Sequence, residues 1–407
     1  MLPYGRQWID EDDIKAVVEV LRSDWLTQGP KVEEFEKAMA EYCGAKYAVV
    51  VSSGTAALHL ACLVAGIKQG DEAITSPITF VASANCVLYC GGKPVFADID
   101  KDTYNIDPAE IKKKITKKTR AIIPVHFAGL PCDMGAIKKI AEEYDLIIIE
   151  DACHALGAEY RIQDSGLRTK EEWIKVGSCS HSDMAVFSFH PVQHITTGEG
   201  GAVLTNNEKF YEKLLSFRNH GITKDPEKFT NKDLAFPLSS EPLIHNPNPW
   251  YYEMQELGFN HRITDIQCAL GTSQLRKLDS FISRRRKIVS IYNQALGDMR
   301  LIKIPVEPKT KNSACHLYPV QMDFEKLGKS RFKVMAELKE KGIGTQVHYI
   351  PVHLQPYYRR RLGFRQGDYP AAEEYYNKAL SLPLYPGMRD KDITKVINSV
   401  EECANVK

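Results

Sequence analysis

The feature of this sequence that most restricts its fold is a series of short apolar runs that alternate with helix-like segments over the first two hundred residues. Seven runs are rich in apolar and β-branched residues, and they cover residues 47–51, 72–75, 94–97, 121–125, 146–149, 185–189 and 201–205. Apolar strands separated by helices are typical of a mostly parallel sheet that is covered on both faces. We therefore predict an α/β fold built on a seven-stranded, mostly parallel sheet.

The rest of the chain predicts a second unit. A helical stretch over residues 263–291 follows the apolar series, and short strands and helices alternate after it. This pattern predicts a large domain over residues 1–270 and a smaller C-terminal α/β domain over residues 271–407. Residues 161–176 and 224–250 are expected to be loops, and the second is long enough to cover a site or reach a partner.

Charge and composition argue against several classes of function. The chain has 53 basic and 52 acidic residues, a net charge of +1, so no strong field attracts nucleic acid or a membrane surface. No apolar run approaches the ~20 residues of a membrane span, and the acidic start lacks the apolar core of a signal peptide. The ten cysteines are scattered without a CxxC pair, unlike a zinc or iron–sulfur site. We expect a cytoplasmic protein without a metal.

Polar residues follow several of the predicted strands, where ligands bind in an open α/β sheet. The run SSGTAA at residues 52–57 opens a helix, and its backbone N–H groups suit a phosphate, although alone such a run is more typical of a plain helix cap. Glu150 and Asp151 follow the fifth strand. A carboxylate there could pair with the cationic ring nitrogen of a cofactor, or could simply begin a helix.

Two further positions complete this set. Ser188 follows the sixth strand and could add a hydroxyl to the phosphate site, while Gln193, five residues later, is placed to reach the reactive carbon of a cofactor. Phe80 follows the second strand and could stack on a flat ring, although its position alone favours a core aromatic. Each signal is modest by itself, and their order and spacing together indicate a cofactor site.

With these residues the chain resembles the DegT/DnrJ/EryC/StrS-type sugar nucleotide aminotransferases, which are pyridoxal phosphate enzymes of fold type I. The resemblance runs from about residue 3 to the C-terminus. LTQGPKVEEFE, EDACHALGAEY, HLYPV and QVHYIP indicate that the UDP-4-keto-6-deoxy-N-acetylhexosamine 4-aminotransferases of the pseudaminic acid pathway are the subgroup it resembles most. The matching stretches are SSGTAALHLA (52–61), SPITFVASAN (76–85), EDACHALGA (150–158), FSFHPV and HITTGEGG on either side of Gln193, RNHGI (218–222), GFNHRITDIQCALG (258–271), HLYPV (316–320) and TQVHYIPVH (345–353).

The resemblance implies a cofactor role for several residues. Gly54, Thr55 and Ser188 would hold the phosphate of pyridoxal phosphate. Phe80 would stack on the pyridine ring. Asp151 would pair with the ring nitrogen and keep it protonated, so that the ring can act as an electron sink.

It also implies a shared site and a substrate. His154 would lie beside the phenolic oxygen of the cofactor, and Asn260 would reach the phosphate in the other subunit of a homodimer. The implied substrate is a UDP-linked keto sugar, the amino donor is glutamate, and the product is a 4-amino-4,6-dideoxy sugar nucleotide. The residues expected to line the nucleotide-sugar pocket are Tyr4, Trp25, Leu26, Thr27, His316, Leu317 and Tyr318.

Gln193 departs from the family, which has at this position the lysine that forms the internal aldimine and then moves a proton. A carboxamide nitrogen has its lone pair delocalised, so it can neither form an imine nor accept a proton near neutral pH. Glutamine keeps much of the bulk and polarity, so the pocket should survive while transamination should not. His194 is expected to face away from the cofactor, because neighbouring side chains in an extended segment point to opposite sides.

Three hypotheses follow. In the first, which we favour because the other site positions match, the chain is an aminotransferase inactivated by a substitution at residue 193. It would then hold pyridoxal phosphate, pyridoxamine phosphate or the external aldimine with the amino sugar. In the second, the chain is a pyridoxamine phosphate-dependent enzyme similar to the sugar dehydratases. In the third, it is a non-catalytic relative that binds the cofactor or a sugar nucleotide.

Overall fold

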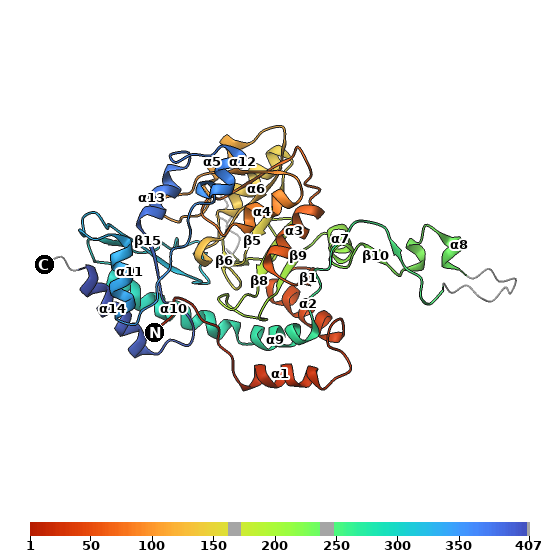
Figure 1. Cartoon of the computed structure of the whole chain (residues 1–407), viewed down its shortest axis with the longest axis horizontal. Coiled ribbons are helices and arrows are strands. Elements are labelled where there is room, and N and C mark those ends of the chain that lie inside the picture. The colour runs from red at the N-terminus through yellow and green to blue at the C-terminus, as the bar shows by residue number, and fades with distance from the viewer. Residues whose placement is uncertain (162–171, 237–247, 405–407) are drawn as a thin grey trace.

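The computed structural model shows a large α/β body with a smaller domain at one side (Figure 1). It describes residues 1–161, 172–236 and 248–404. The central sheet has seven strands in the order β1-β9-β8-β5-β4-β2-β3. Only β9 runs antiparallel to its neighbours in this sheet, so the predicted seven-stranded, mostly parallel sheet is confirmed. The strands are β1 (Tyr47–Val51), β2 (Glu72–Thr75), β3 (Lys93–Phe96), β4 (Thr119–Ile123), β5 (Ile147–Asp151), β8 (Met184–Ser188) and β9 (Gly201–Thr205).

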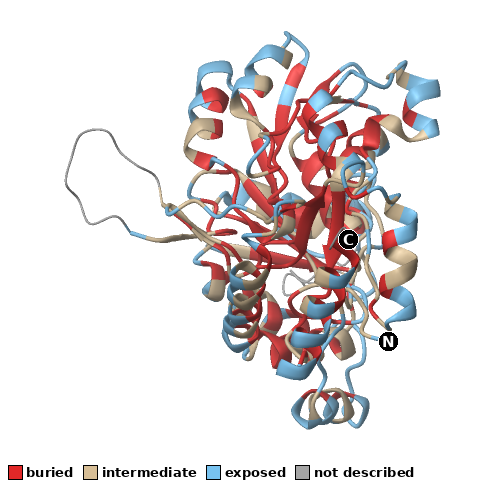
Figure 2. Cartoon of the chain, turned by 90° about the vertical axis from the view of Figure 1, so that its left-hand side faces the viewer, coloured by how far each residue is buried: buried red, intermediate tan, exposed pale blue. Residues whose placement is uncertain are grey.

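Helices cover both faces of this sheet because its strands are apolar on both sides. Figure 2 shows the strands as the most continuously buried part of the chain, with exposed residues on the outer sides of the helices. One face packs against α3 (Gly54–Val64), α4 (Ala82–Tyr89) and α7 (Glu208–Arg218). The other packs against α2 (Pro30–Cys43), α6 (Met134–Tyr144) and α9 (Asp265–Leu275).

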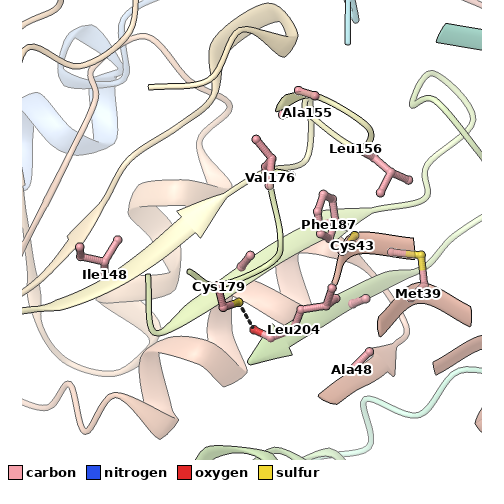
Figure 3. Close-up of a cluster of buried hydrophobic side chains, with 14 of the residues drawn as sticks. Met39, Cys43, Ala48, Ile148, Ala155, Leu156, Val176, Cys179, Phe187 and Leu204 are labelled. Atoms are coloured by element: carbon pink, nitrogen blue, oxygen red, sulfur yellow. Dashed lines mark hydrogen bonds between the residues drawn. The ribbon is translucent and has the colours of Figure 1, made fainter. Parts of the chain in front are cut away.

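The packing on the second face follows from the alternation of side chains along each strand. Met39 and Cys43 of α2 belong to one buried cluster with Phe187 of β8 and Leu204 of β9 (Figure 3). The Cys179 thiol donates to the Leu204 carbonyl oxygen at 3.3 Å. All ten cysteines are free thiols, and those in this cluster serve as small apolar side chains.

The smaller domain contains an antiparallel three-stranded sheet of β12 (Ile302–Lys303), β14 (Tyr318–Met322) and β15 (Ala379–Leu382). Its core is formed by residues between 288 and 404, and includes α10 (Leu278–Leu296), α11 (Arg331–Glu340) and α14 (Asp390–Ala404). The smaller C-terminal α/β unit is therefore confirmed. The start of α10 packs in the core of the large domain and its end in that of the small one, so a boundary at residue 270/271 stays a prediction.

Two expectations about elements differ from the structure. The helical stretch over residues 263–291 is two helices, α9 and α10, separated at Arg276 and Lys277. The fifth strand does not end before Glu150. β5 continues to Asp151 because Glu150 and Asp151 pair with Ala185 and Val186 of β8, and the alternative that these carboxylates begin a helix is wrong.

A segment between α7 and α9 stands out from the body (Figure 1). It contains the strand pair β10 (Ile222–Thr223) and β11 (Glu253–Met254), with η2 (Pro226–Lys228) and α8 (Lys232–Ala235) between them. We call the described residues of this segment, 219–236 and 248–258, the arm. Of the two expected loops, residues 162–171 and 237–247 lie outside the described residues, while β7 (Ile174–Lys175) pairs with β6 (Glu159–Tyr160).

The remaining elements lie outside the central sheet and the three-stranded sheet of the small domain. Within the described residues, no helix is both long and apolar enough to cross a membrane. The remaining elements are α1 (Glu11–Leu21), α5 (Pro108–Lys114), η1 (Phe127–Gly129), β13 (Lys311–Asn312), η3 (Val352–Leu354), α12 (Pro356–Leu362) and α13 (Pro370–Lys378).

Candidate active site

A cavity of about 690 Å³ lies at the carboxyl ends of the parallel strands, where segments of both domains meet. This is the edge of the sheet at which the sequence places the cofactor. The cavity brings together predicted site residues that are far apart in the sequence. These residues are Tyr4, Gly54, Thr55, Phe80, Asp151, His154, Ser188, Gln193 and His316.

One end of the cavity is formed by the start of α3. Ser53 caps this helix, and its side-chain oxygen accepts the Ala56 N–H at 3.1 Å. Gly54 comes next, and a Cβ atom at this position would lie 2.7 Å from the Cβ of Ser188. The glycine therefore keeps open a cradle of backbone N–H groups and hydroxyls at a helix N-terminus. Such a cradle fits a phosphate group.

The middle of the cavity suits a flat cationic ring. Phe80 is 58% exposed, so the alternative of a core aromatic is wrong and its ring is free to stack. Asp151 is only 5% exposed, and within the described residues no Lys, Arg or His nitrogen lies within 4.0 Å of its carboxylate. Its oxygens accept instead from Ser83 Oγ at 2.6 Å and from Cys153 N–H at 3.3 Å. A buried carboxylate without a cation is costly, and a protonated ring nitrogen would supply the missing partner.

A row of aromatic rings forms one wall. The ring of His154 stacks on that of His316, with centroids 4.3 Å apart, and its Nε2 lies 3.1 Å from the Tyr349 hydroxyl. Burial, with a smaller effect of His348, lowers the pKa of His154 to about 3. Burial and the neighbouring rings also hold the pKa of His316 well below its usual value. These imidazoles are therefore neutral at pH 7.

His194 lies behind this wall. It is buried, its ring centroid is 5.2 Å from that of His316, and its Nε2 is 3.0 Å from the carbonyl oxygen of Ala314. The residue does not line the cavity, in agreement with the expectation that it faces away. Burial, with the nearby Arg285 as a smaller cause, holds its pKa well below the usual value.

Gln193 lines the cavity from the loop after β8. Its backbone N–H donates to the carbonyl oxygen of His190 at 2.8 Å. Its side-chain oxygen is buried and has no hydrogen-bond partner among the described residues. No lysine lines the cavity in the described part of the chain, so none takes over the position that the glutamine occupies.

The structure does not bring the other predicted residues to this cavity. Tyr318 hydrogen-bonds Asn293 at 2.7 Å, and with Leu317 it lines a separate cavity of about 50 Å³. Asn260 is exposed where the arm joins the body. The proposed ligand contacts of all these residues stay predictions. Trp25, Leu26 and Thr27 are exposed and lie outside the cavity.

Several cavity residues received no role from the sequence. His348 and Tyr349 belong to the stretch TQVHYIPVH, which matched the family in the sequence. That match did not show which of its side chains would line the site. Ser83 lies in the matched stretch SPITFVASAN, but nothing in the sequence shows that its side chain meets a residue 68 positions away. The cavity residues that sequence reasoning missed include Thr79, Ser83, Glu199, Gln346, His348, Tyr349 and Gln355.

Comparison with known proteins gives matches over nearly the whole chain. Residues 7–401 match the DegT/DnrJ/EryC1/StrS aminotransferase family. The spore coat polysaccharide biosynthesis protein SpsC of Bacillus subtilis is 39% identical, over 98% of this chain and 96% of that protein. Helicobacter pylori PseC, an aminotransferase of pseudaminic acid biosynthesis, is 32% identical with a TM-score of 0.85 over 99% of both chains. Spr1654 of Streptococcus pneumoniae, solved in a PLP-form and a PMP-form, is 29% identical with TM-scores of 0.85, over 99% of this chain and 98% and 97% of those chains.

Proposed function

Because the chain belongs to the DegT/DnrJ/EryC1/StrS aminotransferase family, whose members use pyridoxal phosphate, we propose that its site binds this cofactor with a UDP-linked 4-keto-6-deoxy-N-acetylhexosamine or its 4-amino product. We further propose that Gln193 prevents the amino transfer. A sugar substrate is supported by the names of SpsC and PseC. The UDP group, the 4-keto position and glutamate as the amino donor rest on the resemblance of the motifs.

One observation carries the proposal, namely that the buried carboxylate of Asp151 has no cation beside it among the described residues and faces a cavity that also holds the exposed ring of Phe80. Gly54, Thr55 and Ser188 would bind the phosphate at the start of α3, and Phe80 would hold the ring by stacking. When bound, the cofactor supplies an electron sink for the reacting carbon of the substrate.

Turnover fails in this proposal because neither residue 193 nor the buried wall of the cavity, as far as the chain is described, supplies a suitable base. Gln193 has no basic lone pair. Burial lowers the pKa of His348 to about 4, and it raises the pKa of the Tyr349 hydroxyl above its usual value. Together with His154, these groups are poor proton acceptors near pH 7, so a bound amino group could be held but not passed on.

A change of Gln193→Lys tests this proposal. It should restore glutamate-dependent amination of a UDP-4-keto-6-deoxy-N-acetylhexosamine, detected by mass spectrometry of the sugar nucleotide. The parent chain and Gln193→Met, a matched change that adds no base, should be slower by about 10³-fold or more. If Gln193→Lys binds the cofactor covalently and still aminates no such sugar, the aminotransferase proposal is wrong.

His190 favours a second candidate function. Its imidazole is exposed and lines the cavity three residues before Gln193, so it could move protons in place of a lysine. A pyridoxamine phosphate-dependent elimination would then remove the 3-hydroxyl of the keto sugar. Incubation of the parent chain with pyridoxamine phosphate and the keto sugar tests this, and His190→Ala should abolish the loss of water. If the parent chain binds neither cofactor nor sugar nucleotide, a purely binding role is excluded as well.

We also propose that two copies complete the site. In the described part of the chain, the charged groups that line the cavity are the carboxylates Asp151 and Glu199, with neither lysine nor arginine. Ligands that carry several phosphate charges need more cationic or donor groups than this. Asn260 and the neighbouring arm of a second copy would supply them. The ten free thiols support a reducing, cytoplasmic compartment.

A further inference from the structure

Two hydroxyl groups form a short chain that ends on the carboxylate of Asp151. The hydroxyl oxygens of Thr79 and Ser83 are 2.6 Å apart, and Ser83 Oγ is 2.6 Å from Asp151 Oδ2. All three residues are at least 95% buried and line the cavity. A hydroxyl has one proton to donate. Since Ser83 donates to the carboxylate, Thr79 donates to Ser83, and both bonds are polarised toward Asp151.

The same turn of the chain also carries Phe80. The Ser83 N–H donates to the Phe80 carbonyl oxygen at 3.3 Å. The position of the exposed ring is therefore linked, through one residue, to the position of the carboxylate. Ser83 donates to Oδ2 of Asp151, whereas Oδ1 accepts the longer bond from Cys153 N–H, and the Cys153 thiol lies beside the same carboxylate. Oδ1 thus keeps capacity for a further donor.

Among the described residues, no cationic group pairs with Asp151. The titratable groups that face it in this part of the chain are Cys153, His154 and Tyr349. Burial raises the pKa of the Cys153 thiol and of the Tyr349 hydroxyl and lowers that of His154 to about 3, so all three are neutral at pH 7. Among the described residues, the orientation of the carboxylate therefore depends on its hydrogen bonds and not on an ion pair.

We infer that Ser83 is a positioning residue that fixes the Asp151 carboxylate and turns its free oxygen toward the ring nitrogen of the cofactor, where it would accept a hydrogen bond from the protonated nitrogen. This inference rests on the proposed function, and it adds a residue to which no role had been assigned. Without the Ser83 hydroxyl the carboxylate would be free to turn away, and the protonated ring nitrogen would lose the partner that favours its charged form. The ring then becomes a weaker electron sink.

The test measures the ring directly. Pyridoxamine 5′-phosphate labelled with ¹⁵N in the ring is bound to the full chain, and the ¹⁵N chemical shift reports whether the nitrogen is protonated. Ser83→Ala should move the shift toward the unprotonated value and weaken binding about tenfold. Ser83→Thr, which keeps a hydroxyl, should restore the parent shift. Thr79→Val removes only the upstream donor and should give a smaller change in the same direction.

Ser273→Ala is the matched control. Ser273 is also a buried serine, and it donates to Asp13 at 2.6 Å between α9 and α1, outside the cavity. Its loss should leave the ring nitrogen unchanged. If Ser83→Ala binds the labelled cofactor with the parent shift, the inference about Ser83 is wrong while the proposed function stands. If the parent chain binds no pyridoxamine phosphate, the proposed function fails and the inference fails with it.

Discussion

Single residues in this site owe their charge state to burial. The wall of the cavity consists of imidazole and phenol groups that are neutral at pH 7. His154 lies in this wall between His316 and Tyr349. An ordinary histidine titrates near pH 6.5, whereas burial lowers the pKa of His154 in the folded chain to about 3. In the unfolded chain the same imidazole takes up a proton as the pH falls below 6.5. The folded state therefore has the full stability linked to His154 above pH 6.5 and loses it between pH 6.5 and 3.

Replacing His154 should flatten the acid side of the stability profile. We expect His154→Asn to reduce the slope of the unfolding free energy between pH 6 and 4.5 by up to about 1.4 kcal/mol per pH unit, because one proton fewer is taken up on unfolding. Urea unfolding at several pH values measures the slope. Phe127→Leu changes a buried ring whose centroid lies 6.3 Å from that of the His154 ring. This change should lower stability without changing the slope. Equal slopes in His154→Asn and the parent would contradict the expectation.

At the level of elements, the start of α3 and the end of β8 are held closer together than a side chain at residue 54 would allow. A Cβ at Gly54 would approach Ser188 Cβ at 2.7 Å and Oγ at 3.1 Å, and a Cβ at Gly201 would lie 2.5 Å from the Ser53 carbonyl oxygen. Both glycines are needed for this close approach of strand, helix and loop. The phosphate cradle is thus a property of how the two elements pack, and either one alone is an ordinary helix cap or strand end.

Gly54→Ala tests this packing. The added methyl group has to push Ser188 out of the cradle, so we expect binding of pyridoxal phosphate to weaken at least about tenfold, as from the loss of one or two hydrogen bonds to a charged group. Equilibrium dialysis at fixed pH measures the affinity. Gly5→Ala is the control, since a Cβ there meets only ordinary contacts with Val192 at 3.8 Å and beyond. Equal affinities in Gly54→Ala and Gly5→Ala would show that residue 54 does not shape the phosphate site.

The elements also show which parts of the fold the sequence could predict. Continuous apolar runs identified all seven strands, because burial on both faces leaves an unmistakable pattern. The end of β5 was missed because Glu150 and Asp151 are polar, and the tertiary pairing with β8 decides that they are part of the strand. The break between α9 and α10 was missed because the run around Lys277 keeps a helical pattern. Lys277 forms ion pairs with Asp10 and Asp13, more than 260 positions away.

At the level of the whole molecule, the candidate site depends on contacts between distant segments. The positions of Gly54, Asp151 and Ser188 follow from the general rule that ligands bind at the carboxyl ends of parallel strands. No such rule gives the contribution of the small domain. Tyr349 reaches His154 through a hydrogen bond that joins residues 195 positions apart, and only the packing of the two domains produces it. The residues at the carboxyl ends of the strands were thus predictable from the sequence, whereas the contribution of the small domain was not.

The arm gives the last prediction at this scale. In the arm, the residues Trp250, Met254 and Leu257 are 75%, 62% and 76% exposed. The arm stands away from the body (Figure 1). Exposed apolar side chains grouped on one projecting segment are typical of a surface that is covered in an assembly.

If a second copy covers them, the parent chain should be a dimer in light scattering, and Trp250→Asp combined with Leu257→Asp should be a monomer. Because Asn260 is proposed to reach the partner's cavity, the monomer should also bind pyridoxal phosphate more weakly than the dimer. Phe332→Asp, at a residue 82% exposed on α11, should change neither property. A parent chain that is monomeric at high concentration, or an arm variant that stays dimeric with full cofactor affinity, would rule out a site shared through the arm.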